Sequence, residues 1–341
     1  MISRVADHCF WFGRYVERAE STARLLATTH NLALDADLPA AQCWRPVIVV
    51  AGEEEAFLTY ARNQPPDPTM TASRASIALL SDDDPDSPWR DGDRVERYLT
   101  WSEDSPVSIR RSVSGARWNA RQIREVLSLE AWETTNELHL WLSDDSALVD
   151  WSERRFDFYR RVRSTTQLCL GLLRSTMLHD EPLDFIWLGV MLERVNQTAR
   201  ILDVQHHALT SLPVRHEVVE TALWLSLLRS LSGFEPFMKR NQGRVDPEAV
   251  AEFLLSEDRF PRSVAYCVHQ AYERLRAIRP AEATDLPGGR ALERLRLLDE
   301  QVRERRGRIR GGLALHELLT TVVEETHAAC GDLGRELLGQ G

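Results

Sequence analysis

Apolar residues recur along the chain at spacings of three and four, in several long stretches. Phe12, Val16 and Ala19 begin one such stripe, which on a helix would face a protein core. Strict alternation of apolar and polar residues is nearly absent, and the glutamates after the one β-prone run, 46–50, favour a helix there as well. The pattern predicts an all-α protein with helices at 4–33, 44–62, 106–128, 130–142, 150–178, 183–209, 214–231, 247–256, 261–279, 287–306 and 311–336.

The segment 64–95 breaks this pattern with prolines and clustered aspartates. Apart from the short apolar stretch 77–80, its composition buries too little apolar surface to offset the entropy cost of ordering. We therefore expect an exposed or disordered acidic loop at 64–95. A turn is expected at 281–289, where Pro287 is followed by two glycines.

One sixteen-residue segment occurs twice. Residues 11–26 and 187–202 both read W-x-G-x-x-x-E-R-x-x-x-T-A-R-[LI]-L, with eight identical positions and no gap. A second match begins at Ser102 and at Ser256, and the interval between the two motifs is 21 residues longer in the first copy, which the acidic loop accounts for. The repeat predicts a helical bundle of two tandem related halves, 1–180 and 181–341, that pack about a pseudo-two-fold axis as one compact unit.

Each copy of the repeat places a glycine, a glutamate and an arginine along one helical flank. The glycine permits another backbone to approach closely. If the copies pack about the axis, Glu17 is expected to meet Arg200, and Glu193 to meet Arg24. The candidate polar cluster of the two copies comprises Glu17, Arg18, Arg24, Glu193, Arg194 and Arg200.

Two interpretations of this polar cluster stay open. The residues form structural ion pairs, in which case removing one buried partner costs roughly 3–5 kcal/mol. Alternatively they line a polar groove for a charged ligand or partner, and desolvated carboxylates there serve as general acids or bases.

Charge and cysteine usage narrow the class of protein. A formal net charge of −10 argues against a broad nucleic-acid or anionic-membrane surface, which would be basic. Five scattered cysteines without a C-x-x-C pair indicate reduced thiols. No apolar run approaches the roughly 20 residues that span a bilayer, and the first eight residues lack the apolar region of a signal peptide. We expect a cytoplasmic protein with neither nucleic acid nor membrane as a partner.

The block from Phe10 to Leu26 resembles the N-terminal signature of the bacterial alpha-E family, and the segments 119–124, 130–133, 188–200 and 260–264 resemble later parts of the same family. The resemblance covers nearly the whole chain. The departures are the acidic loop, which is longer than the family pattern, and 189–192, which lacks the polar Arg-Tyr pair of the first copy.

The resemblance implies an almost wholly helical protein that occurs beside, or fused to, circularly permuted ATP-grasp proteins, often near transglutaminase-like peptidases. ATP-grasp enzymes activate a carboxylate as an acyl phosphate and pass it to an amine. The implied role is therefore an accessory or partner subunit of a peptide or amide ligase system, with ATP and Mg bound by the partner. Two alternatives remain: a stand-alone enzyme that acts on a peptide-like substrate through Glu17, Glu193 and nearby arginines, and a purely structural scaffold.

Other motifs give weaker signals. The chain has neither a phosphate-binding P-loop nor a dinucleotide fingerprint, so no cofactor is expected in it. Glu324 and His327 have the spacing of half a di-metal carboxylate site, but no third or fourth ligand stands out, and no metal is expected. Ser263 and Ser108 suit the first turn of a helix as caps, whereas Arg262 with Ser263 would alternatively bind an anion.

A basic face precedes Glu130 and is either solvated helix surface or a substrate or partner patch. A nearby group of tryptophans (Trp118, Trp132, Trp141 and Trp151) forms either a core layer or a binding face. The candidate patch comprises Arg117, Asn119, Arg121, Arg124, Glu130 and Trp132.

Overall fold

A computed structural model of the chain describes residues 3–35, 38–63, 87–210, 217–242, 245–279, 286–307 and 313–340. These residues form fifteen α-helices and one short 3-10 helix, and no strand occurs among them. The prediction of an all-α protein is confirmed. No helix within the described ranges is both long and apolar enough to cross a membrane.

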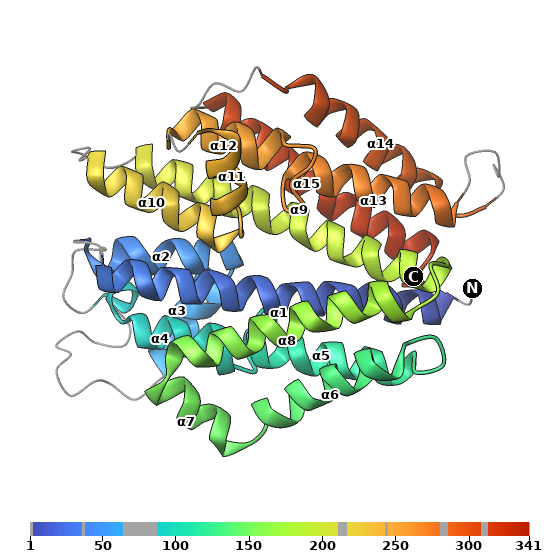
Figure 1. The fold of residues 1–341 in the computed structure, drawn as a ribbon, viewed down its shortest axis with the longest axis horizontal. Coiled ribbons are helices and arrows are strands. Elements are labelled where there is room, and N and C mark those ends of the chain that lie inside the picture. The colour runs from blue at the N-terminus through green and yellow to red at the C-terminus, as the bar shows by residue number, and fades with distance from the viewer. Residues whose placement is uncertain are drawn as a thin grey trace.

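The first half of the chain forms the lower layer in Figure 1. Its elements are α1 (Ser3–Asp35), α2 (Ala40–Ala51), α3 (Glu54–Asn63), η2 (Pro88–Arg90), α4 (Gly92–Trp101), α5 (Ile109–Gln122), α6 (Leu129–Leu142), α7 (Asp145–Glu153) and α8 (Arg155–Thr176).

The second half forms the upper layer, and the N- and C-termini lie near each other (Figure 1). Its elements are α9 (Glu181–Thr210), α10 (Glu217–Ser230), α11 (Phe234–Arg240), α12 (Pro247–Ser256), α13 (Val264–Ile278), α14 (Gly289–Glu304) and α15 (Leu313–Glu336).

The helices α1 and α9 run side by side through the middle of the molecule (Figure 1). The side-chain hydrogen bonds between α1 and α9 join residues that are 175 to 179 positions apart in the sequence. Because this separation stays nearly constant along the pair, the two helices run in the same direction. Leu26 of α1 and Leu202 of α9, which end the two copies of the repeat, are both fully buried. The larger of two hydrophobic core clusters contains residues of both halves.

Several predicted boundaries were wrong for local reasons. The helix expected at 44–62 is divided at Gly52, whose φ of 75° lies in the left-handed region that favours glycine. The helix expected at 150–178 is divided at Arg154, where α7 ends and α8 begins. The short helix α11 was not predicted.

The prediction of an exposed or disordered loop at 64–95 was wrong for its last nine residues. Residues 64–86 lie outside the described ranges, but 87–95 are ordered, with η2 and the start of α4. Trp89 and Val95 are buried there and Asp91 caps α4 by accepting a bond from the Arg94 N–H. The buried apolar side chains of η2 and α4 therefore outweigh their acidic neighbours and anchor the end of this segment in the core.

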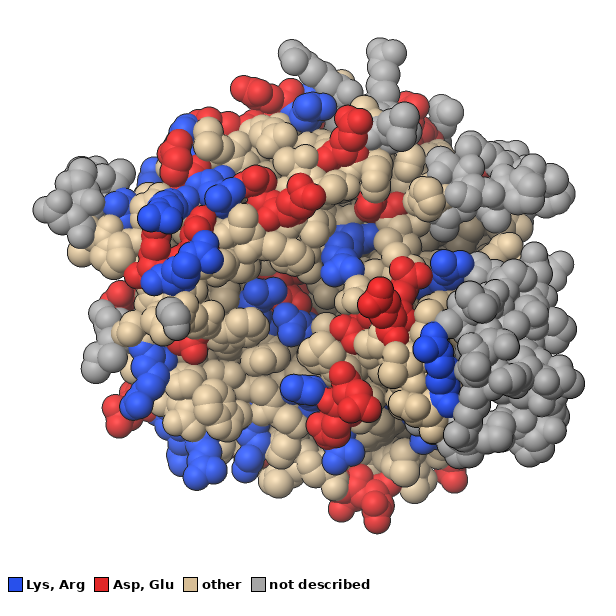
Figure 2. All heavy atoms as spheres, turned by 180° about the vertical axis from the view of Figure 1, so that it is seen from behind, with Lys and Arg blue, Asp and Glu red and all other residues tan. Residues whose placement is uncertain are grey.

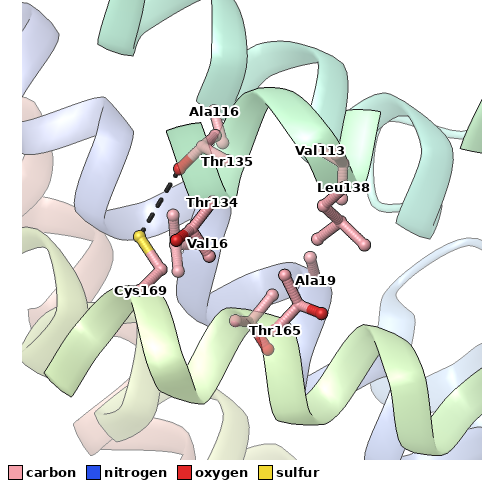
Figure 3. A pocket seen from close by; sticks show the side chains of 10 residues that line it. Val16, Ala19, Val113, Ala116, Thr134, Thr135, Leu138, Thr165 and Cys169 are labelled. Atoms are coloured by element: carbon pink, nitrogen blue, oxygen red, sulfur yellow. Dashed lines mark hydrogen bonds between the residues drawn. The ribbon is translucent and has the colours of Figure 1, made fainter. Parts of the chain in front are cut away.

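A small cavity lies between α1, α5, α6 and α8 (Figure 3). Its volume is about 10 Å³, close to the minimum that holds one water molecule, and its lining exposes only apolar surface. The hydroxyl of Thr135 lies 3.5 Å from the sulfur of Cys169 at its edge. The cavity is a packing defect of the core and is too small to be a ligand site.

Candidate functional site

Two glycines of the repeat set the distance between α1 and α9. A Cβ atom added at Gly13 would lie 2.1 Å from the carbonyl oxygen of Ile186, and one added at Gly189 would lie 2.2 Å from the carbonyl oxygen of Phe10. Each glycine thus lies against the backbone three residues before the other glycine. Since no side chain fits at either position, the two helices approach closely enough for their charged side chains to cross from one to the other.

The first group of crossing charges is the Glu193 cluster, which comprises Glu193 of α9 with Arg14 and Arg18 of α1. Arg18 donates from Nε to one carboxylate oxygen at 2.7 Å and from Nη2 to the other at 3.0 Å. Arg14 donates from Nε at 2.8 Å. The Glu193 side chain is 1 % exposed, so three charge-assisted hydrogen bonds replace its water. The Arg14 and Arg18 guanidiniums also lie over the rings of Trp11 and Tyr15.

The second group is the Glu17 cluster, which joins α1, α9 and the turn before α13. Glu17 accepts hydrogen bonds from Arg194 and from Arg262, both at 2.8 Å. Arg262 also donates to Glu20 at 2.7 Å, and Arg24 pairs with Glu20 one turn along α1. The cluster therefore comprises Glu17, Glu20, Arg24, Arg194 and Arg262.

The predicted pairing between residues 11–26 and 187–202 was right in that each glutamate meets an arginine of the other helix, and wrong in which arginine it meets. Glu17 pairs with Arg194 and Glu193 with Arg18, so the arginine directly after each glutamate reaches the other helix. Arg24 remains on its own helix, bound to Glu20. Arg200 donates to the carbonyl oxygen of Val49 at 3.1 Å.

Sequence reasoning did not place three residues in these clusters. Arg14 and Glu20 were not singled out, and Arg262 was considered only as part of an anion site. Glu20 carried a usable signal, because it lies four residues before Arg24 on a helix and one turn after Glu17. Arg262 carried none, since it is 245 residues from Glu17 in the sequence.

Burial and ion pairing act in opposite directions on these carboxylates. Burial alone would raise the pKa of Glu193, but attraction to Arg18 and Arg14 outweighs it and lowers the pKa to about 2. The pKa of Glu20 is lowered in the same way, with burial opposed by Arg262 and Arg24. Both side chains are therefore held as anions at neutral pH.

The lowered pKa predicts a loss of stability in acid. Because the folded pKa of Glu193 lies below its ordinary value of 4.5, the pairing contributes its full stability above pH 4.5, and this contribution is lost as pH falls toward 2. We expect the difference in free energy of unfolding between the wild type and Glu193→Gln, measured with urea, to shrink between pH 7 and pH 3. An unchanged difference would contradict the pairing.

The residues proposed as an anion site have other partners. Ser263 accepts a hydrogen bond from the Tyr266 N–H at 3.1 Å and caps α13, so the capping interpretation is confirmed. Ser108 caps α5 by accepting from the Arg111 N–H. Both outer nitrogens of Arg262 are bound to Glu17 and Glu20, which makes the Arg262–Ser263 pair unsuited to an anion.

The predicted patch does not form a single face. Arg121, Arg124 and Glu130 are exposed, and the Arg124 guanidinium lies over the half-buried ring of Trp132. Asn119 instead is buried against α1, where its side-chain oxygen bonds the His8 ring at 2.9 Å.

Arg117 donates to Asn136 of α6, which leaves the three exposed residues and Trp132 as the accessible part of the patch. The tryptophan group is divided in the same manner, since Trp141 and Trp151 are buried whereas Trp118 is 57 % exposed.

Other reactive groups are kept unreactive by burial. Burial raises the pKa of the Cys9 thiol to about 12 and of the Cys169 thiol to about 11, so neither is a thiolate at neutral pH. Within the described ranges, no three His, Cys, Asp or Glu side chains come together as a metal ion would require. Acidic and basic side chains are interspersed on the face seen in Figure 2, and neither sign covers a broad area of that face.

Three curated relatives are similar to most of the chain. An uncharacterized protein of Mycobacterium bovis (strain ATCC BAA-935 / AF2122/97) is 26% identical over 306 residues, which is 87% of this chain and 31% of that protein. Uncharacterized proteins of Mycobacterium tuberculosis strains CDC 1551 / Oshkosh and ATCC 25618 / H37Rv match with the same identity and coverage. The chain therefore spans about a third of the length of the curated relatives it matches. No solved structure matches the chain.

A family model also matches, over residues 1–337, and it describes a predicted alpha-helical domain with a conserved ER motif. The two central helices of this fold carry adjacent Glu-Arg pairs at 17–18 and 193–194, and both pairs lie at the contact between the helices. With helices and no strand among the described residues, and a family match over residues 1–337, the chain belongs to the Alpha-E family.

Proposed function

We propose that this chain is an accessory or partner subunit of an ATP-grasp-type peptide or amide ligase system, which helps to bind or position the ligase or its substrate. The supporting observation is that the chain aligns with only 31% of each curated relative, so the helical unit there is one part of a longer polypeptide. Joining two modules in one chain raises their effective concentration to the millimolar range, which favours modules that work together. A separate chain would need an interface to reach the same result.

The stand-alone enzyme is the weaker alternative. A general base works best when its pKa lies near the operating pH, and Glu193 is held far below it by two arginines. Its carboxylate oxygens are already engaged by hydrogen bonds and its side chain is 1 % exposed. These features suit a structural ion pair that fixes the α1–α9 contact, and the catalytic chemistry, with ATP and Mg, is assigned to the partner.

We infer further that the two halves arose by duplication and pack about a pseudo-two-fold axis. The reciprocal contacts of Gly13 and Gly189 support this, as do the crossed pairs of Glu17 with Arg194 and Glu193 with Arg18. Each glutamate also binds a second arginine, and in this the two clusters differ. Arg14 of α1 binds Glu193, whereas Arg262, in the turn before α13, binds Glu17.

Co-expression with a circularly permuted ATP-grasp protein tests the proposed role. We expect the two proteins to co-purify and ADP release against a panel of amines to require both. The double variant Arg121→Glu, Arg124→Glu, which reverses the charge of the exposed patch, should weaken the complex, because both guanidiniums are solvent-accessible. Arg290→Glu on α14, whose side chain is 79 % exposed, is the matched control and should leave the complex intact.

Two results would contradict the proposal. One is the absence of any complex with the ATP-grasp protein. The other is turnover of a peptide-like substrate by the isolated chain that Glu193→Gln abolishes without unfolding it, which would establish the enzyme instead.

A further inference from the structure

The Glu17 cluster has more positive than negative charge around it. Its two carboxylates, Glu17 and Glu20, face three arginines of the cluster itself. A fourth arginine, Arg163 of α8, lies beside them, close enough for Arg24 and Arg262 to disfavour its charged form. Like charges in a partly desolvated site repel strongly, so the site favours an added anion.

Arg163 is a cation that no carboxylate of the described residues binds directly. Its side chain is half-buried and has no hydrogen-bond or ion-pair partner among the described residues, and its Nε is buried without an acceptor. Burial lowers the pKa of Arg163, repulsion from Arg24 and Arg262 lowers it further, and attraction to Glu20 offsets only part of this. A partly desolvated cation that no carboxylate binds directly is costly, and it is tolerated where a ligand supplies the missing contact.

Arg24 provides a second, independent observation. Its side chain is 5 % exposed, and while one nitrogen pairs with Glu20, the Nε has no acceptor. The Arg194 Nε is also buried without one. These unpartnered donors belong to guanidiniums of the same cluster.

The cluster is accessible from the side of α8. Gln167, one turn after Arg163 on that helix, is exposed and donates its amide to Glu20 at 3.2 Å. The side chain of Arg262 is 10 % exposed. Gln167 therefore bonds the same Glu20 carboxylate that Arg24 and Arg262 bind, so α8 lies at the surface side of the cluster.

The donor set decides the class of ligand. Guanidinium groups present parallel N–H donors that match the oxygens of a carboxylate or a phosphate. The cationic surroundings exclude a metal ion. We propose that Arg163 binds a small oxyanion, a phosphate or carboxylate group, at the surface of the Glu17 cluster, where Arg24 and Arg262 add positive charge without contacting the ligand. The site does not depend on the proposed ligase partner.

The test compares anions at matched ionic strength on the full chain. Isothermal titration calorimetry and thermal unfolding are measured with inorganic phosphate and with N-acetylglycine, and N-acetylglycinamide and chloride serve as the uncharged and non-oxyanion controls. We expect the wild type to bind at least one of the two oxyanions and to be stabilised by it. Binding of phosphate alone identifies a phosphoryl site, and binding of N-acetylglycine alone identifies a carboxylate site.

Arg163→Gln should weaken binding about tenfold or more, because a charge-assisted hydrogen bond is lost. Without any anion the same variant should unfold at a higher temperature than the wild type, because it removes repulsion from Arg24 and Arg262. A higher unfolding temperature together with weaker binding would show that the variant is folded and that the loss of binding comes from the missing guanidinium. Arg163→Lys should retain part of the binding. Arg160→Gln, on the same helix but paired with Asp157 on the surface, should bind like the wild type.

Equal binding by the wild type and Arg163→Gln would overturn the site. So would the absence of any effect of phosphate and N-acetylglycine beyond that of chloride.

Discussion

Replacing Gly13 with alanine is expected to lower the free energy of unfolding by about 3 kcal/mol, at the upper end of the range for overpacking a well-packed interior. The added methyl group would lie 2.1 Å from the carbonyl oxygen of Ile186, and backbone atoms cannot move aside as a flexible side chain can. The two central helices would have to separate, which also weakens the ion pairs between them. In Gly189→Ala the added methyl group would lie 2.2 Å from the carbonyl oxygen of Phe10, so we expect a similar loss in the free energy of unfolding. Urea unfolding followed by circular dichroism measures both.

Gly171→Ala is the matched control for these two substitutions. Gly171 lies within α8, and a Cβ atom added there has no atom within 4 Å. Alanine loses less backbone entropy than glycine in a helix, so this variant should be more stable by about 0.5–1 kcal/mol. If all three variants changed stability by the same amount, the close approach of α1 and α9 would not be what the two central glycines provide.

Replacing Glu193 with glutamine should cost about 3–5 kcal/mol at neutral pH, the usual loss when one partner of a buried ion pair is removed. The substitution keeps the shape of the side chain but leaves Arg14 and Arg18 without a counter-charge in a site where the glutamate is 1 % exposed. Thermal and urea unfolding at pH 7 are the measurements.

Glu300→Gln provides the comparison on the surface. Glu300 pairs with Arg296 four residues earlier on α14, but both side chains are more than a third exposed, and exposed pairs of this kind contribute little. Its loss should leave unfolding nearly unchanged. A similar, small effect of both substitutions would mean that the Glu193 cluster is hydrated and does not fix the helices.

Much of this architecture follows from local sequence patterns. The three- and four-residue spacing of apolar side chains predicts helices because it needs only the period of the helix itself. The repeated Trp-x-Gly segment led us to expect that residues 11–26 and 187–202 would pack together, and the glycines do lie at that contact. The capping serines, Ser108 and Ser263, were predictable for the same local reason.

The partners of the charges could not be predicted in this way. Which arginine reaches Glu17 depends on the distance and direction of two helices 176 residues apart, and an amphipathic pattern specifies neither. Arg18 and Arg194 directly follow the glutamates, so a helical wheel places them on a different flank from Glu17 and Glu193. Only the close parallel arrangement of α1 and α9 brings them across. Arg262 reaches the cluster from a turn whose path depends on the whole second half.

The prediction for the acidic segment 64–95 failed for a different reason, because it relied on average composition. Prolines and aspartates dominate 64–95 as an average, yet its last residues hold the buried Trp89 and Val95. A composition argument treats a segment as uniform, whereas a few large apolar side chains at one end are enough to order that end. The helix α4 was missed for this reason.

A double-mutant cycle between Arg18 and Glu193 tests the crossed pairing of the two central helices most directly. The free energies of unfolding of the wild type, Arg18→Gln, Glu193→Gln and the double variant give the coupling energy between the two side chains. We predict a coupling of about 1–3 kcal/mol for this pair, and additivity within about 0.5 kcal/mol for Arg24 with Glu193, which share no partner. Additivity for Arg18 with Glu193, or coupling only for Arg24 with Glu193, would contradict the account.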